Sequence, residues 1–135
     1  MGEYVNRLQE AGITLLCDVR RNPLSRKRGF SKKALAGECE KAGIVYEHLP
    51  ELGIASAERK NIRTPADRVA LFQRYKHETL PNAAAALSRI QAWLADADQR
   101  VALTCFEADP AECHRHCVAE VLQKTTPGLG RVVDL

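Results

Sequence analysis

The sequence has little of what membrane, secreted or repetitive proteins carry. None of its apolar runs approaches the ~20 residues that a membrane-spanning helix needs. The N-terminal residues do not show the basic segment followed by an apolar stretch that marks a secretory signal peptide. Internal repeats, low-complexity tracts and linkers are absent as well, so we expect the 135 residues to form one domain, residues 1–135. These absences predict a cytoplasmic protein that does not enter a membrane.

Cysteines are few and odd in number. The sequence has five of them, Cys17, Cys39, Cys105, Cys113 and Cys117. An odd number in a chain without an export signal predicts reduced thiols. We interpret Cys17 and Cys39 as core residues.

A strong charge of either sign is also missing. The net charge is only +3 and the pI about 8.7, below the ~9 that a dedicated nucleic-acid-binding domain reaches. The basic side chains gather in one stretch, which suits a phosphate-bearing partner. That stretch holds Arg20, Arg21, Arg26, Lys27, Arg28, Lys32 and Lys33. Phe30 is its only aromatic residue, too little to stack single-stranded bases. We therefore expect at most a secondary contact with nucleic acid here.

Strand-like and helix-like segments alternate along the chain. Short apolar runs over residues 13–17, 44–48 and 101–105 predict buried strands, and residues 131–135 a last short one. Helices are predicted over 3–11, 31–43, 82–97 and 110–123, with another beginning at Thr64. This alternation is typical of an α/β fold with three layers, in which helices cover both faces of a mostly parallel sheet.

Polar side chains follow three of the predicted strands. Asp18 and Arg20 come after the first strand, His48 ends the second, and Cys105 and Glu107 follow the third. In a parallel sheet these strand ends meet at one edge, where ligands of open α/β folds bind.

The last predicted helix brings two more polar side chains to this edge. Asp109-Pro110-Ala111-Glu112 has the features of a helix start. On the helical wheel His114 and Arg115 fall near Val118 on the inward side. Burying them requires partners, and the positive end of the helix favours an anion. We therefore expect an anion-accepting site at the edge.

Three segments carry a family resemblance. ITLLCDVRRNPLSRKRGFSKKAL, GIVYEHLPELG and VALTCFEADPAECHRHCVAEVL, in this order and spacing, resemble the YeaO-like family catalogued as domain of unknown function 488. The most specific parts are Asp18-Val19-Arg20 and the residues from Cys105 and Glu107 to Cys113-His114-Arg115. The resemblance implies an α/β fold and these motif positions, but no reaction and no cofactor.

The chain departs from the family pattern at two places. Family members usually begin with an extra strand, whereas this chain begins inside the helix that follows it. A sheet edge left open by a missing strand would favour a homodimer. The family's Leu-Gly-Gly reads Leu52-Gly53-Ile54 here, which predicts a differently shaped loop.

The first functional hypothesis is a small enzyme, or a degenerate enzyme, acting on an anionic substrate such as a nucleotide or a piece of nucleic acid. Its predicted catalytic residues are Asp18, Glu107 and His114, and its predicted anion-binding residues are Arg20, Arg21, His48 and Arg115. The alternative is a non-catalytic binding or interaction module. In it Asp18 and Glu107 would pair with Arg115 and Arg20 as a structural network.

Two further hypotheses involve cysteine. Cys105 after a buried strand resembles the thiol loop of rhodaneses and tyrosine phosphatases, but Glu107 and Asp109 follow it, and carboxylates suppress a thiolate. We therefore predict that Cys105 is a core-packing thiol. Cys113, His116 and Cys117 have the i, i+3, i+4 spacing of zinc ligands on a helix, without a second pair at a fixed spacing. A metal-binding domain stays open as an alternative.

Overall fold

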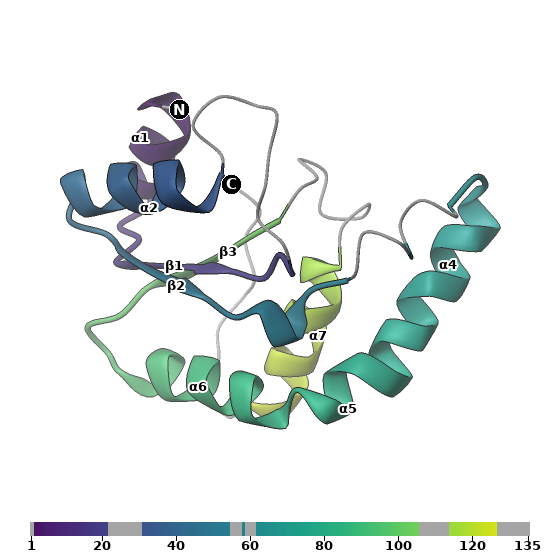
Figure 1. Ribbon diagram of the computed structural model, residues 1–135. Helices are drawn as coiled ribbons and strands as arrows, with labels where there is room; N and C mark the ends of the chain where they lie inside the picture. Colours follow the sequence, from purple (N-terminus) through teal and green to yellow (C-terminus); the bar gives the residue numbers. More distant parts are fainter. Residues whose placement is uncertain (1, 22–30, 55–57, 59–61, 106–113, 127–135) are drawn as a thin grey trace.

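A computed structural model describes residues 2–21, 31–54, 58, 62–105 and 114–126 (Figure 1). Its three strands are β1 (Leu15–Asp18), β2 (Val45–His48) and β3 (Val101–Thr104). Its helices are α1 (Gly2–Glu10), α2 (Lys32–Lys41), α4 (Pro65–Arg74), α5 (Leu80–Asn82), α6 (Ala84–Ala95) and α7 (Arg115–Thr125). A 3₁₀ turn, η1 (Pro50–Leu52), follows β2, and a π-helix, η2 (Tyr75–Thr79), joins α4 to α5.

The sheet has the order β2-β1-β3, and both pairings are parallel. The central strand β1 is buried along its whole length, as its continuous apolar run predicts. Asp18 is in register with His48 on one side and with Thr104 on the other. Three polar residues therefore end the three strands at the same edge of the sheet.

Helices cover both faces of this sheet, which confirms the predicted α/β architecture (Figure 1). On one face Leu16 packs with Val5 and Leu8 of α1 and with Leu35 of α2. On the other face Leu15, Cys17 and Val19 pack against residues of η2, α6 and α7. Val118 is one of the α7 residues in this cluster. We call these the α1–α2 face and the α7 face. Successive side chains of a strand point to opposite faces, so residue parity decides on which face each site residue lies.

Local sequence signals explain most helix ends. Thr64 is the helix cap that was expected, and the structure shows that it forms a capping box with Asp67: Thr64 Oγ1 accepts from the Asp67 amide at 3.1 Å, and Asp67 Oδ2 accepts from the Thr64 amide at 3.2 Å. Gly12 and Gly43 follow α1 and α2 at φ of 73° and 75°, the left-handed region that favours glycine. Ser31 occupies the N-cap position of α2, although its side chain makes no capping hydrogen bond.

The helix expected over 82–97 is present as α6, and a break at Ala83 separates it from the one-turn helix α5, which was not expected. Pro81 is the physical reason: it has no N–H to continue the α-helical ladder, and η2 takes up the mismatch through the i→i+5 bond from the Leu80 amide to the Tyr75 carbonyl. Of the helix expected over 110–123, the structure describes α7 from Arg115 onward. Its predicted start, 109–112, and the predicted strand 131–135 lie outside the described residues.

Candidate functional site

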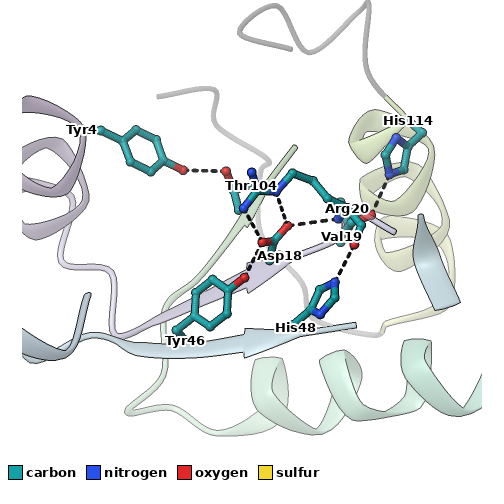
Figure 2. A network of polar contacts seen from close by, with 8 residues as sticks. All are labelled: Tyr4, Asp18, Val19, Arg20, Tyr46, His48, Thr104 and His114. Carbon is teal, nitrogen blue, oxygen red and sulfur yellow. Dashed lines mark hydrogen bonds and ion pairs between the residues drawn. The ribbon is translucent and has the colours of Figure 1, made fainter. Parts of the chain in front are cut away.

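A buried ion pair occupies the end of β1 (Figure 2). Asp18 is fully buried and Arg20 is 2% exposed. Arg20 Nε donates to Asp18 Oδ1 at 2.8 Å and Nη2 to Oδ2 at 2.6 Å, while the Arg20 backbone amide also donates to Oδ1 at 3.1 Å. Residues two apart on an extended chain point the same way, so this two-pronged contact forms within one strand end.

A tyrosine from the neighbouring strand completes the surroundings of the carboxylate. The Tyr46 hydroxyl donates to Asp18 Oδ2. Burial, together with the hydrogen bond and charge of Asp18, raises the pKa of Tyr46, which therefore stays protonated and donates. Burial alone would lower the pKa of Arg20, but the hydrogen bonds and charge of Asp18 outweigh it and raise the pKa above its ordinary value. Four donors thus surround one carboxylate.

On the same face, β3 contributes Thr104. Its hydroxyl accepts a hydrogen bond from the Tyr4 hydroxyl of α1 at 2.9 Å. Burial raises the pKa of Tyr4, while this hydrogen bond and the positive charge of Arg115 act in the opposite direction. Arg115 is half-buried, and its positive charge favours the ionised form of the Tyr4 hydroxyl. We call Tyr4, Asp18, Arg20, Tyr46, Thr104 and Arg115 the edge cluster.

His114 lies against the α7 face rather than within the edge cluster. It is fully buried, and its Nε2 lies 2.8 Å from the Val19 carbonyl oxygen. Because a carbonyl only accepts, Nε2 carries a proton. The other ring nitrogen, Nδ1, lies 3.5 Å from Cys105 Sγ. The Tyr75 ring meets the imidazole edge-on at 5.2 Å between centroids, and the Tyr75 hydroxyl donates to the Leu52 carbonyl at 2.5 Å.

His48 and Arg21, the two remaining described candidates, lie near the residues that follow β1. His48 Nε2 lies 2.6 Å from the Arg20 carbonyl oxygen and therefore donates to it. Arg21 is exposed. Its backbone passes directly over Gly53, where an added Cβ would collide with the Arg21 amide nitrogen and Cα. The loop after β2 therefore needs glycine at position 53 for this close approach.

The structure brings some predicted site residues together and separates others. Asp18 and Arg20 are in contact, and Arg115 reaches the same face. The structural pairing expected between Asp18 and Arg115 is replaced by the Asp18–Arg20 pair. Glu107 lies outside the described residues.

Among the cysteines that the structure describes, one departs from the expectation of reduced thiols. Cys17, Cys39 and Cys117 are free and fully buried, in agreement with it. Cys105 packs against the core of the α7 face, as predicted, but it is disulfide-bonded and not a thiol, so that part of the prediction is wrong. Within the described ranges no group of three or more His, Cys, Asp or Glu could hold a metal ion. His116 and Cys117 are in contact, with 3.5 Å between Nε2 and Sγ, whereas Cys113 lies outside the described residues.

Sequence reasoning missed Tyr4, Tyr46, Thr104 and Tyr75. For two of them a signal was present. Tyr46 is two residues before His48 and Thr104 is the last residue of β3, so strand alternation places both on the face of Asp18. Tyr4 and Tyr75 lie on helices whose docking only the tertiary structure reveals.

Comparison with known proteins gives one match. Residues 1–122 match the family model described as domain of unknown function DUF488. No curated protein and no solved structure matches the chain. Among the described helices, none has the length and apolar character required to cross a membrane.

Proposed function

Since this chain belongs to the DUF488 family, which is described without an activity, we propose a function from its site: the edge cluster binds an anionic, phosphate-bearing substrate, as in a small or degenerate enzyme. A nucleotide or a nucleic-acid end has the required chemistry.

The position of the buried polar residues carries this proposal. In the described part of the chain the buried polar or charged residues are Asp18, Arg20, Thr104 and His114. All four lie at the carboxyl ends of the strands or at the start of α7. Burying such groups costs free energy that a fold alone does not require, and this edge is where open α/β folds bind ligands. Their concentration there supports a binding site.

Within this proposal Asp18 positions Arg20 rather than acting as a base. Its two carboxylate oxygens already accept four hydrogen bonds, which leaves them poorly placed to take a proton from a substrate. Glu107 then remains the candidate for acid–base chemistry at the edge cluster, because the ring nitrogens of His114 face Val19 and Cys105 on the α7 face.

Arg115 is the proposed anion contact. It is the first residue of α7, where the backbone amides and the helix dipole favour negative charge. Its guanidinium acts on Tyr4, whose hydroxyl bonds Thr104, so a phosphate bound there would meet a charged fork and two hydroxyl groups.

The test compares two variants of the same helix. Arg115→Ala should weaken the binding of inorganic phosphate or nucleoside monophosphates about 10- to 100-fold, the loss of one charge-assisted contact. Lys124→Ala removes the same charge from an exposed position at the other end of α7 and should leave binding unchanged. Calorimetric titration measures affinity and thermal melting checks the fold. Equal affinities of the wild type and Arg115→Ala for every phosphate ligand would refute the proposal.

The saturated Asp18 carboxylate also favours a second candidate, a non-catalytic module in which the edge cluster is structural. In that case the wild type and Arg115→Ala bind phosphate ligands alike, and Asp18→Asn lowers the melting temperature by leaving the buried Arg20 guanidinium without its counter-charge.

A further inference from the structure

Cys105 differs from the other described cysteines. Cys17, Cys39 and Cys117 are fully buried, whereas Cys105 is only partly buried. Burial raises the pKa of Cys17 to about 12 and those of Cys39 and Cys117 to about 11, which makes these three thiols unreactive. Cys105 is also the one that is disulfide-bonded. Accessibility and oxidation therefore coincide at one cysteine.

A histidine is oriented toward this cysteine. Because His114 Nε2 donates to the Val19 carbonyl at 2.8 Å, its Nδ1 is the nitrogen without a proton in the neutral ring. That nitrogen is the one 3.5 Å from Cys105 Sγ. A nucleophile, a base and a group that orients the base form the arrangement that activates a cysteine.

We propose that Cys105 is the nucleophile of a thiol–disulfide exchange site, in which His114 takes the proton of the reduced thiol and Val19 orients the imidazole. The imidazolium so formed would donate one N–H to the thiolate and the other to the Val19 carbonyl. The Tyr75 ring packs edge-on against the imidazole, and its hydroxyl is held by Leu52, so it limits rotation of the ring without supplying a charge.

The reaction balances with a small thiol as reductant. Two molecules of a low-molecular-weight thiol reduce the Cys105 disulfide and leave as one disulfide, so the protein gains two thiols. The Cys105 thiolate then attacks a substrate disulfide, one sulfur of which bonds to Cys105, while the other leaves as a thiolate and takes the proton from His114. A further molecule of the low-molecular-weight thiol displaces the bound half as a thiol, and another one frees Cys105 by leaving together with the first as a disulfide. Each cycle converts one substrate disulfide to two thiols.

This site is separate from the edge cluster. Cys105 packs with the core of the α7 face. Asp18 points to the opposite, α1–α2 face, because it lies two residues after Leu16, which packs there. The experiment below reads sulfur chemistry alone and needs no phosphate ligand. Its outcome is therefore independent of the proposed phosphate site.

The test is the pH profile of alkylation of the reduced full chain by iodoacetamide, with each cysteine followed by peptide mass spectrometry. An ordinary thiol with a pKa of ~8.5 reacts about 80-fold more slowly at pH 6 than at pH 8. We expect Cys105 to slow less than about 5-fold, while buried Cys17, Cys39 and Cys117 stay unmodified at both pH values and serve as internal controls.

Two further measurements complete the design. In His114→Gln, Cys105 should be alkylated about 80-fold more slowly at pH 6 than at pH 8, like an ordinary thiol. Added to the reduced wild-type protein, the neutral probe 2-hydroxyethyl disulfide should form a mixed disulfide with Cys105, which peptide mass spectrometry detects. An ordinary pH profile for wild-type Cys105 overturns the proposal even if the variant does not fold. A folded variant that keeps the flat profile overturns the role of His114, and with it the proposal.

Discussion

Removing the charge of Asp18 tests how the edge cluster is held together. Asp18→Asn keeps the shape of the side chain but leaves the Arg20 guanidinium, only 2% exposed, without a counter-charge. The substitution also replaces one of the two acceptor oxygens that receive hydrogen bonds from Arg20 and Tyr46 by an amide group, which only donates. Breaking a buried ion pair by removing one partner costs about 3–5 kcal/mol. We expect a loss of stability in that range.

Chemical and thermal unfolding measure this loss. For a chain of 135 residues, 1 kcal/mol corresponds to roughly 3–5 °C, so the melting temperature should fall by about 10–20 °C. Urea titration gives the free energy directly. Asp98→Asn is the matched control because Asp98 is exposed, and it should change stability by no more than about 0.5 kcal/mol.

A double variant separates charge pairing from packing. Arg20→Met alone leaves the buried Asp18 carboxylate without its arginine and should also destabilise. If pairing is the cause, Asp18→Asn/Arg20→Met loses less stability than the sum of the two single variants, by ~1–3 kcal/mol. Additive losses, or an Asp18→Asn variant as stable as its control, would refute the reasoning.

Two other predictions concern the fold around the site. Gly53→Ala should destabilise by about 1–3 kcal/mol, since its Cβ meets the Arg21 backbone, whereas Gly37→Ala, which has open space, should stabilise α2; urea titration distinguishes the signs. Burial raises the pKa of Cys17 from 9.0 to about 12, so its stabilisation is complete below pH 9 and is lost as pH rises toward 12. Between pH 7 and 10 the wild type should lose about 1.4 kcal/mol more stability than Cys17→Ala, and equal losses would contradict this.

Much of the fold follows from local sequence. The apolar run of β1 predicts a strand buried on both faces, and Thr64 with Asp67 predicts the start of α4, because these signals act between residues close in the chain. The split at Ala83 was not predicted. The apolar pattern continues across Pro81, and the π-helix that absorbs its missing N–H depends on how Tyr75 packs.

Strand order indicates which residues lie at this edge of the sheet, but not how their charges pair. Parallel strands bring Asp18, His48 and Thr104 to one edge whatever their partners are. Which cation meets Asp18 depends on side-chain geometry, and Arg20, two residues away, requires no tertiary contact to reach it. The disulfide at Cys105 could not be read from the odd number of cysteines, because that number does not say which thiols are buried.

The alternation of side chains along a strand places the two proposed sites on opposite faces of the sheet, at the same edge. The Asp18 carboxylate lies on the face of Leu16, while the Val19 carbonyl between the motif's two charged residues accepts from His114 on the other side. Asp18-Val19-Arg20 therefore serves both faces: its side chains hold the edge cluster and its backbone orients His114. A variant that keeps the backbone but removes the carboxylate, such as Asp18→Asn, should consequently weaken the edge cluster while it leaves the pH profile of Cys105 alkylation unchanged, provided that the protein is assayed below its lowered melting temperature. A Cys105 profile that changed together with the edge cluster would mean that both faces form one site.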